Sequence, residues 1–173
     1  MHRQRPLTIA SPPAPQVTRF VFVRHGHYDK ASPDPKTASL LERGRAEARR
    51  AAEFLRECGV TPDLIVTTRA VRTRETAEVI AETLGTNLCI RATDGGFARG
   101  KSNLDAKLQE WTEGAARQLV TVICVGHHVQ QNYCLAELEG SVAIPKSARG
   151  SVLIYERGDQ GRWRLTGHQV GGA

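Results

Sequence analysis

Two arginines and two histidines stand at positions in this sequence where their side chains could act together. Arg24, His25, Arg72 and His127 each follow an apolar run with the length and composition of a buried strand. A guanidinium group offers a forked cation to an oxyanion, and histidine is a reactive side chain near neutral pH. If the fold brings the four together, they form a pocket for a doubly charged anion, most naturally a phosphoryl group.

The elements that must position these residues follow from the hydrophobic pattern. Alternating strand and helix patterns predict an α/β fold with a single doubly wound, mostly parallel sheet, helices on both faces and an antiparallel hairpin at the C-terminal edge. Parallel strands joined by right-handed crossovers end at one edge of the sheet, so the four side chains should meet there. Strands are expected at residues 20–23, 63–68, 88–92, 120–125, 151–156 and 163–167, and helices at 42–58, 73–84, 103–119 and 129–138.

Length and composition indicate one globular domain preceded by a tail. The chain has 173 residues, of which 40% are hydrophobic and 24% charged, which is ordinary for a domain with a sizeable core. Residues 1–18 hold four of the eight prolines and no acidic residue. We therefore expect a disordered tail at 1–18 and a catalytic domain at 19–173.

Charge and cysteine usage limit the partners and the location. A formal net charge of +6 suits anionic partners, but the scattered aromatic residues do not form the stacking stripe of a nucleic-acid binder. No apolar run approaches the roughly 18 residues needed to span a bilayer. The four cysteines form no Cys-x-x-Cys pair, and no secretory leader is evident. We expect a soluble, cytoplasmic protein with reduced thiols.

Four motifs, in order along the chain, resemble those of a known enzyme family. The sequence is similar to the histidine phosphatase superfamily, the phosphoglycerate-mutase-like proteins with an Arg-His-Gly motif. The resemblance covers about residues 19–170, and the short length looks most like the small SixA-type phosphohistidine phosphatases. The motifs are Val23-Arg24-His25-Gly26, Leu41-x-x-Gly44-Arg45-x-x-Ala48, Arg72-x-x-Glu75-Thr76-Ala77-Glu78 and Val125-Gly126-His127.

The resemblance implies a reaction through a covalent phosphohistidine. His25 is expected to attack phosphorus in its neutral form, while Arg24, Arg72 and His127 hold the phosphoryl oxygens on which charge accumulates. No metal or other cofactor is needed. Further residues expected at the substrate are Gly26, which would let the backbone turn and approach a ligand, Tyr28, which replaces the small hydroxyl residue of the family, and His128.

The acid that protonates the leaving group has two candidates. The family places a glutamate after the third strand, and Asp94 matches that position best, although its side chain is one methylene shorter. Asp29, in the loop after the first strand, is the alternative. If the substrate is phosphohistidine, the phosphorus–nitrogen bond is already labile and a strong acid matters less.

Competing interpretations of the same residues stay open. Gly95–Ser102 satisfies the Gly-x-x-x-x-Gly-Lys-Ser pattern of a nucleotide-binding loop. His25, His27, His127 and His128 could meet as metal ligands, although the neighbouring arginines oppose a cation. Arg72 could instead pair with Glu75 or Glu78 on the surface. A phosphate-binding module without turnover is a further possibility.

The favoured substrate is phosphohistidine or another phosphorylated protein. A small phosphorylated metabolite, handled by a phosphatase or a mutase, is the alternative, because both present the same phosphoryl group.

Overall fold

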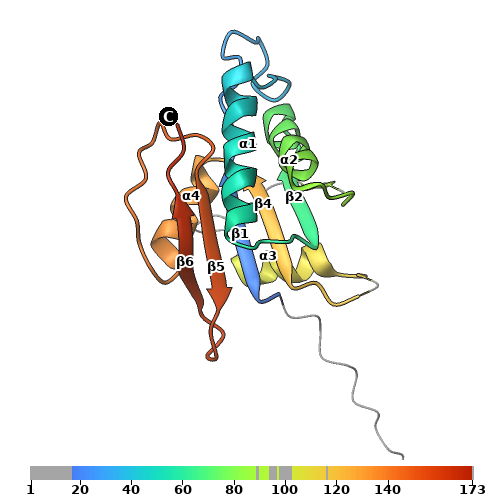
Figure 1. The fold of residues 1–173 in the computed structure, drawn as a ribbon, viewed down its shortest axis with the longest axis vertical. Helices are drawn as coiled ribbons and strands as arrows, with labels where there is room; N and C mark the ends of the chain where they lie inside the picture. The colour runs from blue at the N-terminus through green and yellow to red at the C-terminus, as the bar shows by residue number, and fades with distance from the viewer. Residues whose placement is uncertain (1–16, 89, 94–96, 98–102, 116, 173) are drawn as a thin grey trace, which may run out of the picture.

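A six-stranded sheet lies between two layers of helices in the computed structural model (Figure 1). The structure describes residues 17–88, 90–93, 97, 103–115 and 117–172. Its elements are β1 (Arg19–Arg24), α1 (Glu42–Glu57), β2 (Leu64–Thr68), α2 (Val71–Leu84), β3 (Ile90–Thr93), α3 (Leu104–Thr112), β4 (Thr121–Gly126), α4 (His128–Glu137), β5 (Val152–Arg157) and β6 (Trp163–Gln169).

The order of the strands confirms the predicted fold class. The sheet runs β3-β2-β4-β1-β5-β6. The pairs β2–β3, β2–β4 and β1–β4 are parallel, whereas β1–β5 and β5–β6 are antiparallel. Because β1 and β4 are parallel neighbours, with Arg24 opposite Gly126, the residues that follow these two strands emerge side by side.

Alternation along β1 explains why helices cover both faces of the sheet. Val21 and Val23 point into a core shared with α1 and α2, while Phe20 and Phe22 point into a core shared with α3 and α4. All four side chains are fully buried. A strand buried on both faces is apolar throughout rather than alternating, which is the pattern of a central parallel strand.

Two helices differ from their predicted bounds. α2 begins at Val71 rather than Thr73, so Arg72 lies within its first turn instead of in the preceding loop. α3 ends at Thr112, well before the predicted end at 119, because Gly114 adopts a left-handed conformation with φ of 72° and turns the chain.

The packed part of the chain begins earlier than the predicted boundary at residue 19. Val17 is buried in the core under α3, and the Thr18 amide donates to the Val120 carbonyl at 3.0 Å. Residues 1–16 lie outside the described part of the chain, so the expected tail there stays a prediction. No helix in the described residues combines the length and the apolar character needed to cross a membrane.

Candidate active site

The ends of β1 and β4 bring two histidines together at the carboxyl edge of the sheet. The His25 amide donates to the Gly126 carbonyl at 3.0 Å, which ties the ends of the two strands to each other. His127 follows directly, and the ring centroids of His25 and His127 are 5.3 Å apart. The predicted meeting of these two side chains is therefore present in the structure.

His25 is held in one orientation and one tautomer. Its side chain is almost completely buried, and Nδ1 lies 2.8 Å from the Gly26 carbonyl oxygen. A carbonyl can only accept, so Nδ1 carries the hydrogen and Nε2 presents a lone pair. Burial lowers the pKa of His25 to about 3 against the opposing effect of the bond to Gly26, and His127, Arg72 and Arg24 lower it further. His25 is consequently neutral at physiological pH.

Gly26 supports this orientation through close backbone packing. A Cβ atom at Gly26 would lie 2.4 Å from the Gly44 carbonyl oxygen, and one at Gly44 would lie 2.0 Å from the His27 carbonyl oxygen. Gly26 does not adopt a positive φ, so the close packing against Gly44 is what requires a glycine here, while its expected approach to a ligand stays a prediction. Its amide donates to the Thr76 hydroxyl at 3.2 Å, and the next peptide group, which carries the carbonyl that orients His25, is held by the His27 amide donating to Glu47 at 2.9 Å.

His127 is positioned by a threonine that sequence reasoning did not identify. Its Nε2 lies 2.8 Å from Thr68 Oγ1, at the end of β2, and its Nδ1 lies 3.4 Å from Arg72 Nη2. Arginine can only donate, so Nδ1 accepts and the hydrogen on Nε2 is donated to Thr68. Burial, followed by Arg72 and Arg24, lowers the pKa of His127 to about 4. The one available signal was the position of Thr68 at a strand end.

Arg24 and Arg72 bring positive charge to the histidines without an ion pair to a carboxylate in the described residues, although the charge of the buried Glu47 raises the pKa of Arg24. Arg24 is 5% exposed and donates to the Lys146 carbonyl at 2.6 Å, while Arg72 donates to the Pro35 carbonyl. Burial is the main cause that lowers the pKa of both guanidinium groups. Within the described residues, neither arginine forms an ion pair with a carboxylate, and both Nε atoms are buried without a hydrogen-bond partner. An incoming dianion would supply the missing charge.

The alternative in which Arg72 pairs with a helix glutamate is wrong. Glu75 accepts hydrogen bonds from the Leu40 amide and from Arg45, and Glu78 pairs with Arg74 at 3.5 Å. Arg72 instead places its guanidinium carbon 4.6 Å from the centroid of the Tyr28 ring. The start of α2 therefore directs Arg72 towards the histidines.

Tyr28 and His128 lie next to the two histidines, and their expected contact with the substrate stays a prediction, whereas His27 is engaged elsewhere. The Tyr28 ring centroid lies 5.3 Å from that of His25. His128 is the first residue of α4, and its pKa is lowered, chiefly by burial. His27 Nδ1 lies 2.6 Å from the carboxylate of Glu47, on α1. The described residues contain no group of three or more histidine, cysteine, aspartate or glutamate side chains arranged to hold a metal.

The two candidate acids have different outcomes. Asp94 lies outside the described residues, as does all of 95–102 except Phe97, so the predicted acid and the nucleotide-loop interpretation both stay untested. Asp29 is exposed, and its carboxylate accepts a hydrogen bond from the Ala31 amide within its own loop. That bond assigns Asp29 a role in shaping the loop.

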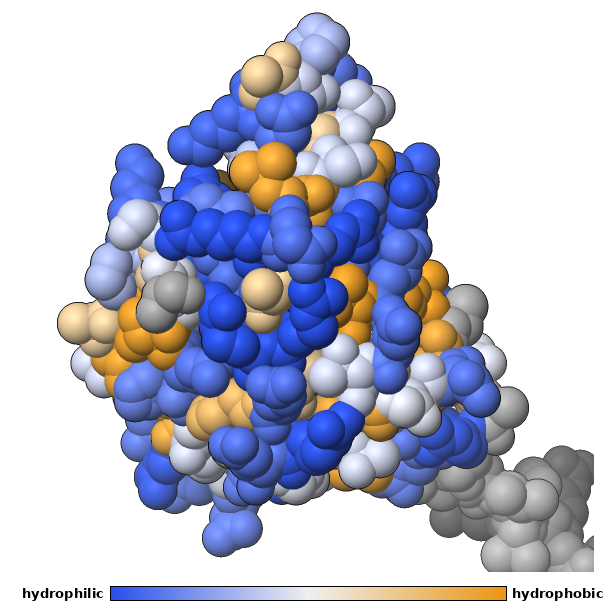
Figure 2. All heavy atoms as spheres, turned by 45° about the horizontal axis from the view of Figure 1, so that its top comes forward, coloured by the Kyte–Doolittle hydropathy of each residue, from blue (hydrophilic) through white to orange (hydrophobic). Residues whose placement is uncertain are grey.

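The end of the molecule that carries this site is strongly hydrophilic. Figure 2 turns the carboxyl edge of the sheet towards the reader, and hydrophilic side chains gather across it with single apolar ones between them. A buried cluster of cations below such a surface suits a charged ligand that arrives from water.

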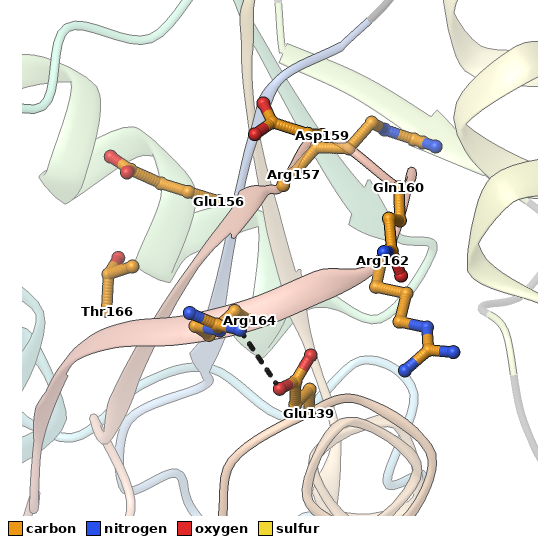
Figure 3. Close-up of a pocket in the computed structure, with 9 residues that line it drawn as sticks. Glu139, Glu156, Arg157, Asp159, Gln160, Arg162, Arg164 and Thr166 are labelled. Carbon is orange, nitrogen blue, oxygen red and sulfur yellow. Dashed lines mark hydrogen bonds and ion pairs between the residues drawn. The ribbon is translucent and has the colours of Figure 1, made fainter.

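A hollow at the β5–β6 hairpin differs from this site in its charges (Figure 3). Acidic and basic side chains alternate there, and Arg164 pairs with Glu139 at 3.2 Å. Glu156, also in its lining, pairs with Arg19 at 2.7 Å. The residues that line this hollow include no histidine or cysteine. Its charges are therefore balanced, and it offers no nucleophile comparable to His25.

The fold and the site together define the class of protein. The family model of the histidine phosphatase superfamily (branch 1) matches residues 20–95, which include Arg24, His25 and Arg72. This match supports the superfamily that the motifs predict. The fold is also similar to that of solved SixA proteins. The SixA protein from Agrobacterium tumefaciens has a TM-score of 0.69 and 22% sequence identity, covering 90% of this chain and 99% of that one.

Further comparisons agree on the fold and extend to sequence relatives. The protein histidine phosphatase SixA in complex with tungstate has a TM-score of 0.72 at 18% identity, covering 88% of this chain and 96% of that one. A chloroplastic protein of Arabidopsis thaliana, described as uncharacterized, is 25% identical over 91% of this chain and 80% of its own length. The mitochondrial serine/threonine-protein phosphatase Pgam5 of Drosophila virilis is 33% identical over 39% of this chain, but the match spans only 23% of that protein.

Proposed function

We propose that this protein is a phosphatase that hydrolyses phosphoric monoesters or phosphoramidates through a covalent phosphohistidine on His25. One observation carries the proposal: the neutral His25 ring, with Nδ1 bonded to Gly26 and Nε2 free, lies beside His127, the buried Arg24 and the half-buried Arg72. A nucleophile with a fixed lone pair next to uncompensated cations is the arrangement that phosphoryl transfer requires.

The reaction proceeds in two displacements. In the first, the lone pair on His25 Nε2 attacks phosphorus while the bond from phosphorus to the leaving group breaks, and the leaving atom takes a proton from Asp94 or from water. In the second, water attacks the phosphohistidine, Nε2 leaves with the electron pair of the phosphorus–nitrogen bond, and inorganic phosphate is released. Arg24 and Arg72 donate to two equatorial oxygens, where negative charge accumulates in both steps. His127 holds the third oxygen by moving its Nε2–H hydrogen bond from Thr68 to the phosphoryl group.

The favoured substrate is phosphohistidine on a partner protein, or another phosphorylated protein. The likeness of the fold to SixA proteins supports this choice. A small phosphorylated metabolite is the alternative, since the phosphoryl pocket is the same. A cytoplasmic location belongs to the same proposal, supported by the free thiols of Cys58, Cys124 and Cys134.

Trapping the intermediate tests the mechanism. The protein is mixed with an aryl phosphate in the presence of a chelator, quenched in alkali, in which phosphohistidine survives, and analysed by intact mass. We expect one added phosphoryl group that is absent in His25→Ala, together with loss of phosphate release. Turnover that persists in His25→Ala contradicts the proposal.

A substrate panel tests the choice of substrate. A phosphohistidine peptide, a phosphoserine peptide, a sugar phosphate and a phosphoglycerate are compared at one ionic strength, because a cationic site binds every anion better at low salt. The highest kcat/KM is expected for the phosphohistidine peptide. A higher value for a metabolite would assign the protein to small-molecule chemistry, and phosphate transfer between hydroxyls of one metabolite would indicate a mutase.

A further inference from the structure

A third arginine, Arg149, stands beside the phosphoryl pocket in a loop that the family motifs do not include. Its guanidinium carbon lies 5.8 Å from the centroid of the Tyr28 ring, and that of Arg72 lies 4.6 Å from the same centroid. Tyr28 in turn contacts the ring of His25. One aromatic ring thus links the nucleophile with two guanidinium groups.

The loop that carries Arg149 is fixed to the end of β1. The Gly150 amide donates to the Arg24 carbonyl at 3.1 Å, and Arg24 Nη1 donates to the Lys146 carbonyl. Gly150 has φ of +72°, and a Cβ atom there would lie 2.8 Å from the Cβ of Glu47. The chain therefore crosses directly over the buried Glu47, which places Arg149 at the edge of the pocket.

A buried carboxylate and an imidazole orient Arg149. Glu47 is 2% exposed and accepts hydrogen bonds from the His27 amide at 2.9 Å and from His27 Nδ1 at 2.6 Å. Nδ1 donates to the carboxylate, and arginine can only donate, so Nε2 is the ring atom that accepts from Arg149. Arg149 Nη1 lies 3.4 Å from that Nε2. The network directs one edge of the guanidinium towards His27 and leaves its remaining donors available.

The charge around Arg149 is as unbalanced as that around Arg24 and Arg72. In the described part of the chain no carboxylate forms an ion pair with Arg149, and its Nε is buried without a partner. The charge of Arg149 lowers the pKa of both Arg24 and Arg72. Arg149 is therefore close to the other two arginines.

We propose that Arg149 forms a second anion-binding position, next to the phosphoryl pocket and across Tyr28 from Arg72, and that the substrate carries a carboxylate in addition to its phosphoryl group. The inference rests on the proposed phosphatase function. His27 and Glu47 are positioning residues that act through Arg149. A carboxylate bound by the fork of a guanidinium group adds affinity and fixes which part of the substrate faces the outer side of the pocket.

Binding of non-hydrolysable ligands tests the second position independently of turnover. Calorimetry compares phenylphosphonate with 4-carboxyphenylphosphonate and its 3-carboxy isomer. For the wild type we expect at least one carboxylated ligand to bind roughly tenfold to a hundredfold more tightly, as a charge-assisted hydrogen bond allows. Arg149→Ala should remove that preference while changing the affinity for phenylphosphonate by less than about threefold, and Arg149→Lys should retain part of it.

Three binding outcomes overturn the inference. Equal losses for both kinds of ligand in Arg149→Ala would mean that Arg149 serves the phosphoryl group or the fold. A preference that survives in Arg149→Ala would place the second anion elsewhere. No preference in the wild type would remove the second position, whereas failure to trap a phosphoenzyme would affect only the proposed function.

A substitution at His27 tests whether this residue orients Arg149 or only stabilises the fold. In His27→Asn the amide nitrogen can still donate to Glu47, but the acceptor that faces Arg149 is lost. We expect KM for 4-carboxyphenyl phosphate to rise several-fold with kcat unchanged, and both constants for phenyl phosphate to stay the same. A fall in kcat for both substrates would instead show a general structural role for His27. It would contradict the proposal that His27 acts by positioning Arg149.

Two matched peptides identify the source of the carboxylate. The phosphohistidine peptides differ by Asp or Asn next to the phosphorylated residue, and their kcat/KM ratio is measured in wild type and Arg149→Ala. A wild-type preference for the Asp peptide that Arg149→Ala removes supports an acidic residue of a protein substrate. A preference confined to the carboxyphenyl ligands supports the carboxylate of a metabolite, and absence of preference in both sets overturns the inference.

Discussion

The carboxyl edge of the parallel strands and the β5–β6 hairpin both gather arginines, but of the two regions only the edge buries an arginine, Arg24, without an ion pair in the described residues. At the hairpin, Arg164 pairs with Glu139 and its side chain is 68% exposed. At the edge, Arg24 is 5% exposed and no described carboxylate pairs with it. An anion gains little from an arginine that water and a carboxylate already satisfy. Burial without a countercharge therefore distinguishes the reactive surface from an ordinary charged one.

The largest difference between the two regions is expected when one arginine is removed from each. Arg72→Ala deletes a cation that faces the developing charge, so kcat/KM for an aryl phosphate should fall by roughly 10²–10³. Arg164→Ala removes an exposed ion pair and should leave kcat/KM within about twofold. Steady-state phosphate release measures both. Similar losses in the two variants would break the comparison.

A glycine-to-alanine substitution in each region should lower the free energy of unfolding by different amounts. Gly44→Ala forces a Cβ atom to within 2.0 Å of the His27 carbonyl oxygen, so we expect the free energy of unfolding to fall by about 2–4 kcal/mol. At Gly158, in the hairpin turn, an added Cβ atom lies 3.8 Å from the Arg162 carbonyl oxygen, so Gly158→Ala should change the free energy of unfolding by less than about 0.5 kcal/mol. Urea denaturation gives both values, and equal destabilisation would contradict the close packing at Gly44.

Threonine-to-valine substitutions test whether the loss of one side-chain hydrogen bond lowers kcat in each of the two regions. Thr68→Val removes the group that accepts from His127 at 2.8 Å, so the imidazole loses its orientation and kcat should fall about tenfold, corresponding to one hydrogen bond of ~1.4 kcal/mol. Thr166→Val, on β6, removes a 3.4 Å bond to a carbonyl and should leave kcat unchanged. A normal kcat for Thr68→Val would exclude the positioning role.

The smallest expected effect is the response of activity to mild acid. With the pKa of His25 at about 3, the nucleophile stays neutral as pH falls from 8 to 5, so kcat/KM should lose nothing through protonation of His25. An ordinary histidine of pKa about 6.5 would be mostly protonated at pH 5. A pH profile of kcat/KM for an aryl phosphate, corrected for the ionisation of the substrate, measures this. A sharp loss with a midpoint near 6.5 would contradict the buried, neutral state.

In contrast to activity, the stability of the fold should decrease in mild acid. In the unfolded chain His25 and His127 take up protons below about pH 6.5, whereas in the folded protein they do so only near pH 3 and pH 4. The free energy of unfolding therefore falls as pH decreases from about 6.5 towards 4, by up to about 1.4 kcal/mol per pH unit for each group. Denaturation of His25→Gln should show a shallower dependence, while His168→Gln, exposed on β6, should match the wild type.

The parts of this structure that the sequence predicts are those set by local pattern. Strand and helix periodicities gave the order of elements, and a strand-end position placed His25 and His127 at one edge. Thr68 and Arg149 could not be assigned in this way, because their contacts depend on how β2 and the loop before β5 pass the site. The end of α3 was missed because the conformation of Gly114 outweighed an otherwise helical pattern, and the role of Gly26 depends on a distant helix.

The Gly26–Gly44 contact has a consequence for tolerance to change. The first turns of α1 rest against the main chain beside His25, and peptide groups are the same whatever residues carry them. Side chains on the outer surface of α1 can therefore be exchanged widely with little displacement of the reactive nitrogen. Contacts with other molecules along the outer surface of α1 can therefore change without displacing the reactive nitrogen of His25.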